Sequence, residues 1–235
     1  MSVWNNKTLY LCSPFFNVVI TVNDALLTWC RDNLNVGTVA YLPNFVGDEI
    51  PLPPNNRDVK TLVYLANLKA PKNHLNLLKA VRIVANQIPD LSLLLIGKNY
   101  GDAYFAELKS YLTEHSLQDK VVFLGSRTDI STQLQKASIG IIASDSEGLP
   151  MALLEYGMAR LAVVTTDVGQ CREVVATHGV VVPPNDPKAL AEGILTYMVD
   201  DEEKRIEDAR AFNQHIRNNY SFKAIWPRLR ELYST

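Results

Sequence analysis

Two glutamates, Glu147 and Glu155, bracket a stretch whose groups can bind both a phosphate and a sugar. The seven residues between them read GLPMALL and open an apolar helical pattern. The first N–H groups of such a helix, from Gly148 to Met151, have no partner within the helix, and the helix dipole adds partial positive charge there. Donors of this kind bind phosphate, whereas carboxylates accept hydrogen bonds from sugar or ribose hydroxyls. The stretch therefore predicts a crevice for a phosphate that joins two hydroxyl-bearing rings.

The elements that must position these groups follow from the flanking pattern. Residues 138–143 form a short apolar run that suits a strand buried on both faces. A helical pattern covers 151–160. Pro150, just before it, suits the first position of that helix, because an N–H there has no partner in any case. Residues 161–165 then form the next strand. The loop between strand and helix lies at the carboxyl end of its strand, where open parallel sheets bind ligands.

The same alternation of strand and helix runs through the chain from residue 60. Strands are expected at 61–65, 91–96, 121–124, 138–143, 161–165 and 179–182, and helices at 74–88, 104–115, 130–136, 151–160, 173–177 and 188–199. This order predicts an α/β fold with a doubly wound, Rossmann-like parallel sheet. An amphipathic helical tail follows. It is free either to pack on this domain or to cross to another.

The start of the chain is organised differently. Residues 1–45 hold a strand at 15–22, a helix capped by Asn23 or Asp24 and a strand at 39–42, which is too little for a domain. The polar, proline-containing stretch 46–58 predicts a linker. The strand carries several apolar residues, Phe15, Phe16, Val18 and Ile20. Such a strand needs a partner surface, or it forms an exposed patch.

Composition excludes several classes of function. The formal net charge of −2 over 235 residues gives no basic field that would attract nucleic acid. The apolar runs are too short to span a membrane, and residues 1–11 lack the basic start and long apolar run of a signal peptide. Cys12, Cys30 and Cys171 are widely spaced. That spacing predicts reduced thiols in a cytoplasmic protein and no metal cluster.

A family becomes recognisable at these residues. The segment E147-GLPMALL-E155 resembles the Glu-x7-Glu signature of retaining glycosyltransferases of the GT-B fold, in particular the family 4 group. The resemblance spans about residues 42–233 and is most specific between 124 and 173. It implies half of a GT-B fold. The implied segments are a remnant of the N-terminal acceptor domain (1–45), a hinge (46–58), a domain that binds a nucleotide-sugar donor (59–200) and C-terminal helices (201–235).

The resemblance also implies roles for single residues. Glu147 would contact the donor sugar and Glu155 the nucleotide ribose. Lys72 lies in the loop after the first strand of the domain, where the family has a lysine that neutralises the diphosphate. Asn67 stands where the family usually has an arginine. One of two expected cations is therefore replaced by a neutral amide, which counts against full activity.

Further residues complete the implied donor site. Backbone at Gly148, Leu149, Pro150 and Met151 would hold the phosphates. Arg127 would stack on the base, and Gly169, in a GQCRE variant of the family's GGxxE turn, would let the backbone approach the sugar. Asp145 and Glu147 together offer an alternative metal site. Because a lysine and a helix N-terminus can neutralise a diphosphate, we expect no metal and no cofactor other than the donor substrate.

The expected function is metal-independent, retaining transfer from a nucleoside-diphosphate sugar to a glycan or lipid-linked acceptor, in polysaccharide or glycolipid assembly. We expect a cytoplasmic protein, peripheral at the inner membrane face, that works with a missing N-terminal domain or a partner chain. Alone it should bind donor but transfer poorly. Three rivals stay open: a non-catalytic nucleotide-sugar binding module, a sugar-nucleotide epimerase of the same fold, and an interaction domain that binds no nucleotide.

Overall fold

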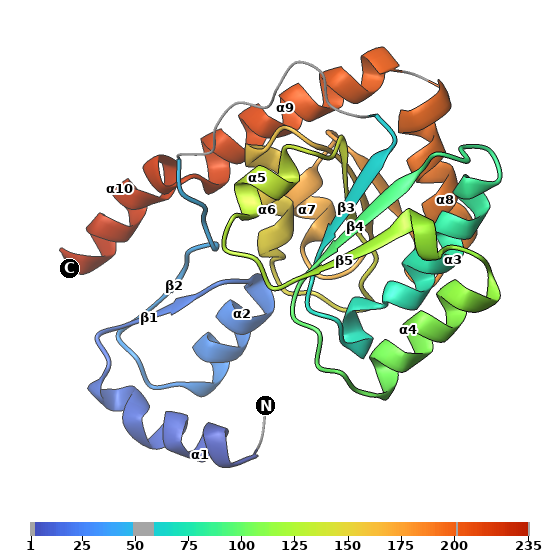
Figure 1. Ribbon diagram of the computed structural model, residues 1–235. Coiled ribbons are helices and arrows are strands. Elements are labelled where there is room, and N and C mark those ends of the chain that lie inside the picture. Colours follow the sequence, from blue (N-terminus) through green and yellow to red (C-terminus); the bar gives the residue numbers. More distant parts are fainter. Residues whose placement is uncertain (1–2, 49–58, 201, 235) are drawn as a thin grey trace.

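The computed structural model describes residues 3–48, 59–200 and 202–234, and it contains one large and one small parallel sheet (Figure 1). The large sheet has six strands in the order β5-β4-β3-β6-β7-β8. Their bounds are β3 Thr61–Leu65, β4 Ser92–Ile96, β5 Val121–Gly125, β6 Ile139–Ile142, β7 Ala162–Thr166 and β8 Val180–Val182. The predicted doubly wound sheet is confirmed. Its strand order reverses between β3 and β6, and this is the place where such sheets bind ligands.

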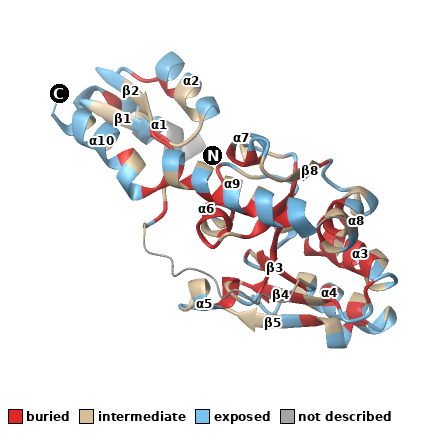
Figure 2. Ribbon diagram, turned by 90° about the horizontal axis from the view of Figure 1, so that it is seen from above, coloured by how far each residue is buried: buried red, intermediate tan, exposed pale blue. Residues whose placement is uncertain are grey.

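The strands of the large sheet are apolar because helices cover both faces. On one face α3 His74–Ala85, α4 Ala103–Glu114 and α8 Pro187–Leu195 pack together. On the other face α6 Met151–Met158 packs against α9 Glu202–Tyr220, which also contacts β7. The shorter helices are α5 Ile130–Leu134 and α7 Cys171–Val175, with 3-10 turns at Ala70–Lys72 and Gln118–Lys120. Figure 2 shows buried residues concentrated in this sheet and its helices.

Side-chain caps explain where several helices begin. Asn73 has a left-handed backbone (φ 45°), and its side chain accepts a hydrogen bond from the Asn76 N–H at the start of α3. Asp102 caps α4, and Asp186 caps α8, which has Pro187 in its first turn. The predicted bounds differ from the observed ones mainly at helix ends. The helix expected to run to residue 199 ends at Leu195, and Thr196–Asp200 continues as a π-helical turn.

The small unit is a βαβ piece, as predicted, but the strand expected at 15–22 spans only Val18–Thr21, because Phe15 belongs to a 3-10 turn. Strands β1 Val18–Thr21 and β2 Thr38–Tyr41 pair in parallel, and α2 Asp24–Asn33 is capped by Asn23. A helix that was not predicted, α1 Val3–Cys12, precedes it and leads into a 3-10 turn at Ser13–Phe15. The apolar residues of α1 do not recur at helical spacing, so the pattern gives no sign of a helix there. Most of the expected linker falls on residues 49–58, outside the described residues, and the domain bounds stay a prediction.

The C-terminal tail does both things that the sequence left open. Helix α9 packs on the large sheet's own domain, whereas α10 Phe222–Tyr233 lies beside the small unit (Figures 1 and 2). The crossing is fixed by backbone pairing, because the Val46 N–H donates to the Tyr220 carbonyl at 2.9 Å and the Phe222 N–H to the Val46 carbonyl at 2.8 Å. Among the described residues, no helix has the length and apolar character that crossing a bilayer requires.

The central strand β6 depends on a glycine. A Cβ added at Gly140 would lie 2.5 Å from Cδ2 of the buried Tyr156 ring. We expect Gly140→Ala to lower the free energy of unfolding by about 1–3 kcal/mol, because the ring must leave its position. Urea unfolding measures this. Gly47→Ala is the control, since a Cβ there meets nothing within 4 Å. Equal unfolding free energies for the two variants would contradict the packing described.

Candidate functional site

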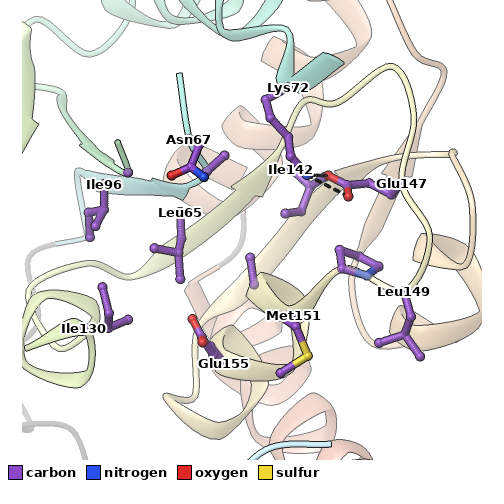
Figure 3. A pocket seen from close by; sticks show the side chains of 14 residues that line it. Leu65, Asn67, Lys72, Ile96, Ile130, Ile142, Glu147, Leu149, Met151 and Glu155 are labelled. Carbon is purple, nitrogen blue, oxygen red and sulfur yellow. Dashed lines mark hydrogen bonds and ion pairs between the residues drawn. The ribbon is translucent and has the colours of Figure 1, made fainter. Parts of the chain in front are cut away.

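A cavity of about 410 Å³ opens at the reversal point of the large sheet, between the carboxyl ends of β3, β4 and β6 and the start of α6 (Figure 3). The predicted site residues that line it are Asn67, Lys72, Glu147, Leu149, Pro150, Met151 and Glu155. Its apolar lining includes Leu65, Ile96, Ile130 and Ile142. The structure thus brings most of the predicted site together, although the residues come from segments far apart in the sequence.

An ion pair between Lys72 and Glu147 lies at one side of the cavity and joins the segment after β3 to the loop after β6. The Lys72 Nζ lies 2.6 Å from Glu147 Oε1 and 2.8 Å from Oε2. The Glu147 side chain is only 8% exposed and that of Lys72 24%. Removing one partner from such a desolvated pair leaves the other charge uncompensated, which is costly. Lys72, expected to face a diphosphate, is therefore held by the glutamate that was expected to face the sugar.

Two buried hydroxyl groups hold this pair, and sequence patterns did not point to either. Ser144 donates from Oγ to Glu147 Oε1 at 2.6 Å. The Tyr64 hydroxyl lies 2.9 Å from Ser144 Oγ and 2.7 Å from the Lys72 carbonyl oxygen, to which it donates. Burial raises the pKa of Tyr64 well above its ordinary value, so the phenol stays protonated. A tyrosine in an apolar strand is typical of a core, so only the fold shows this contact.

Helix α6 presents free donors to the cavity. Pro150 is its N-cap, with an extended backbone (φ −75°, ψ 114°), and Met151 is the first helical residue. The sequence pattern predicts Pro150 one position later, at the first helical position. Pro150 has no side-chain group that can accept a hydrogen bond, and no described side chain caps the helix. The first N–H groups, at Met151 and Ala152, therefore lie uncapped beside a cavity that both residues line.

Glu155 is the other carboxylate of the cavity, on α6 opposite the ion pair (Figure 3). Its Oε2 is buried and has no hydrogen-bond partner among the described residues. Desolvation raises the pKa of this carboxyl above its ordinary value of 4.5. A lone acceptor in a cavity can bind the hydroxyl groups of a ligand.

Two further predicted residues, Gly148 and Gly169, contact each other at the loop that carries Glu147. A Cβ on Gly169 would be 2.1 Å from the Glu147 carbonyl oxygen, and Gly169 has a left-handed backbone (φ 53°). The neighbouring Gln170 N–H donates to the Gly148 carbonyl at 2.9 Å. Gly148 and Gly169 do not line the cavity, but their contact fixes the Glu147 loop. The expected approach of Gly169 to a sugar stays a prediction.

Asn67 lines the cavity, whereas Arg127 does not. The exposed guanidinium of Arg127 pairs with Asp129 at 2.7 and 2.9 Å. Its expected stacking on a base stays a prediction. Asn67 lines the cavity, but its Oδ1 accepts a hydrogen bond from the Lys98 N–H at 2.8 Å. Of the lining residues described, Lys72 is the one with a cationic side chain.

The alternative metal site at Asp145 and Glu147 is split by geometry. Asp145 Oδ1 accepts a hydrogen bond from Asn73 Nδ2 at 2.6 Å, whereas Glu147 is held by Lys72. Within residues 3–48, 59–200 and 202–234, no three His, Cys, Asp or Glu side chains gather in a way that could hold a metal ion. Independence from metal stays a prediction.

The isolated acceptor of Glu155 leads to a pH-dependent prediction. Because the folded-state pKa of Glu155 is raised, the folded state binds the proton more tightly, and ionisation above pH 4.5 destabilises the fold. At pH 7 we expect the free energy of unfolding of Glu155→Gln, measured in urea, to be higher than that of the parent by roughly 1 kcal/mol. The difference should shrink as the pH falls toward 4.5. Glu192→Gln, on the exposed face of α8, is the control. A pH-independent gap between parent and Glu155→Gln would contradict the assignment.

Comparison with known proteins shows which family the chain belongs to. The family model for "Glycosyl transferases group 1" matches residues 49–217. Among curated relatives, lipopolysaccharide core biosynthesis mannosyltransferase LpcC of Rhizobium leguminosarum is 29% identical over 123 residues, covering 52% of this chain and 35% of its own. The gpi3 subunit of phosphatidylinositol N-acetylglucosaminyltransferase from Schizosaccharomyces pombe is 23% identical over 245 residues, covering 100% of this chain and 52% of its own. The chain spans about half or less of the length of these relatives.

Solved structures agree on the fold. Anabaena HepE, crystallised with UDP and glucose, has a TM-score of 0.87 at 20% identity, covering all of this chain and 68% of its own. The C-terminal domain of a group 1 family protein, LpcC of Francisella tularensis, has a TM-score of 0.67 at 20% identity, covering 75% of this chain and 98% of its own. The resemblance read from Glu147 to Glu155 is thus confirmed: this chain belongs to the glycosyl transferases group 1 family, with the Rossmann-like domain of a GT-B fold.

Proposed function

We propose that this chain binds a nucleoside-diphosphate sugar and serves as the donor-binding part of a retaining, metal-independent glycosyltransferase. The observation that carries the proposal is a single cavity that holds Lys72, the uncapped start of α6 and the unpartnered Glu155. A cation, free N–H groups and a lone carboxylate are the groups that a phosphate joined to a sugar requires. Family membership and the names of two relatives, a mannosyltransferase and a subunit of an N-acetylglucosaminyltransferase, support the same conclusion.

The lining suggests how the donor would lie. The diphosphate would accept hydrogen bonds from the Met151 and Ala152 N–H groups and pair with Lys72. The ribose hydroxyls would donate to Glu155. Figure 3 shows Glu155 on the same side of the cavity as Leu65, Ile96 and Ile130, so an apolar wall is available for the base. The sugar would then reach Glu147, at the other side of the cavity.

Chemistry at this site would consist mainly of leaving-group stabilisation. As the bond to the diphosphate breaks, negative charge grows on the phosphate, and preorganised donors stabilise it. Lys72 and the α6 N-terminus would supply that stabilisation. Because Asn67 is neutral, the site has less positive charge than one with a second cation. This observation favours one rival, a nucleotide-sugar binding module without catalysis.

The acceptor, and the further residues that bind it, would contact the small unit. Its exposed apolar side chains include Leu11 (76% exposed) and Phe15 (85%). A groove of about 380 Å³ runs between this unit and α10, lined by Phe15, Phe16, Asn17, Val18, Ile20, Leu232 and Tyr233. We propose that further residues, in the same or a partner chain, cover this groove and complete the acceptor side. Transfer to a glycan or lipid-linked acceptor in polysaccharide or glycolipid assembly, at the cytoplasmic face of a membrane, is part of the same proposal.

Calorimetric titration with UDP, GDP, ADP and CMP tests donor binding. We expect one nucleoside diphosphate to bind saturably, and Glu155→Ala to weaken it by roughly tenfold, about 1.4 kcal/mol, because the ribose loses its acceptor. Glu192→Ala, outside the cavity, should bind like the parent.

The two failures of this experiment have different meanings. Absence of binding by the parent to all four nucleotides would overturn the proposal. Binding that Glu155→Ala leaves unchanged would instead place the nucleotide elsewhere on the molecule.

A further inference from the structure

Four oxygen atoms form a continuous chain beneath the donor cavity. Glu147 Oε1 lies 2.6 Å from Ser144 Oγ, Ser144 Oγ lies 2.9 Å from Tyr64 Oη, and Tyr64 Oη lies 2.7 Å from the Lys72 carbonyl oxygen. The Lys72 ammonium then returns to Glu147 Oε1 at 2.6 Å. The contacts therefore close a ring that joins β3, the 3-10 turn before α3 and the loop after β6.

The ring has fewer hydroxyl protons than oxygen–oxygen contacts. Ser144 and Tyr64 bring one hydroxyl proton each to three contacts, and the carbonyl and the ionised carboxylate at the ends only accept. The Ser144 proton goes to Glu147, because a charged acceptor makes the stronger hydrogen bond. The Tyr64 proton goes to the Lys72 carbonyl, at 2.7 Å, and Ser144 Oγ lies 2.9 Å from the same hydroxyl. Tyr64 thus links the backbone of Lys72 to the group that holds Glu147.

The two hydroxyl residues are themselves firmly held. Tyr64 and Ser144 have no solvent exposure, and neither lines the cavity. The Tyr64 ring packs on the His74 ring, with centroids 4.9 Å apart, and Thr166 Oγ1 donates to the Ser144 carbonyl at 2.8 Å. Burial lowers the pKa of His74 to about 4, so this neighbour is neutral at pH 7. A rigid, uncharged support of this kind suits a positioning role.

We propose that Tyr64 and Ser144 are positioning residues that hold Glu147 and Lys72 in register while a donor occupies the cavity. The inference rests on the proposed function. A donor diphosphate would compete with Glu147 for the Lys72 ammonium. When the ammonium turns to the phosphate, the Ser144 hydroxyl still donates to Glu147, and Tyr64 still anchors the Lys72 backbone. The carboxylate then keeps its place for the sugar without its cation.

A ligand-free experiment tests the ring itself. A double-mutant cycle of Lys72→Met and Glu147→Gln, measured by urea unfolding, gives the coupling free energy between the two side chains. This cycle is run in the parent, in Tyr64→Phe and in Tyr197→Phe. Tyr197 is the matched control, a buried tyrosine whose hydroxyl donates to Asp208 at 2.7 Å away from the cavity. We expect the coupling to fall to less than about half in Tyr64→Phe and to persist in Tyr197→Phe. Unchanged coupling in Tyr64→Phe overturns the inference.

A binding experiment separates positioning from a purely structural role. UDP and UDP-glucose, or the diphosphate and sugar nucleotide of the base that binds, are titrated into the parent, Tyr64→Phe and Ser144→Ala. In Ser144→Ala we expect diphosphate affinity within about twofold of the parent and sugar-nucleotide affinity lowered about fivefold, since only the sugar meets Glu147. In Tyr64→Phe, where the Lys72 backbone also loses its anchor, we expect sugar-nucleotide affinity to fall more than diphosphate affinity. An equal loss of both affinities in the two variants overturns the inference. Absence of any nucleotide binding by the parent overturns the proposed function, whatever the coupling experiment shows.

Discussion

The ion pair between Lys72 and Glu147 is the interaction on which the candidate site depends. It crosses the point where the strand order of the large sheet reverses, between the segment that follows β3 and the loop that follows β6. A doubly wound sheet leaves a crevice at this point because the helices on its two sides diverge. The two opposite charges of the pair are largely shielded from water, at 8% and 24% side-chain exposure. Electrostatic attraction between them is therefore stronger than at an exposed surface.

Outside this ion pair, polar groups of the cavity lack hydrogen-bond partners in the part of the chain that the structure describes. Glu155 Oε2 has no donor among the described residues, and no side chain caps the first turn of α6. Unsatisfied polar groups lower stability in a folded chain, so their persistence in one cavity suits a site whose ligand supplies the missing partners. The ionised form of Glu155 is disfavoured for the same reason. Stability and binding thus place opposite demands on this residue.

Local patterns predicted much of the fold and of the cavity lining. The apolar runs placed every strand of the large sheet, and Asn23 was correctly predicted as a possible cap of α2. Glu147 and Glu155 were predictable because a loop after a buried strand must face the ligand edge of a parallel sheet. Helix ends were less predictable, because the turn at Thr196–Asp200 changes its winding without a proline or glycine.

What could not be predicted depends on contacts across the sheet. Tyr64 and Ser144 are 80 residues apart, and nothing in an apolar strand marks a tyrosine as a support for a charged pair. The pairing of Lys72 with Glu147, rather than with a phosphate alone, likewise needs the register of β3 beside β6. Arg127 was expected to stack on a base. Its guanidinium pairs with Asp129, two residues away, and the stacking stays a prediction.

The central claim is that a nucleoside diphosphate binds in the cavity, with its phosphates at the start of α6 and its ribose at Glu155. The most direct measurement is amide NMR of the ¹⁵N-labelled chain, titrated with the diphosphate that binds best. We predict that the largest shifts fall on Met151, Ala152, Glu155 and Gly97, around the cavity at the sheet reversal. Shifts confined to the groove of Phe15, Phe16 and Tyr233, or to no coherent surface, would contradict it.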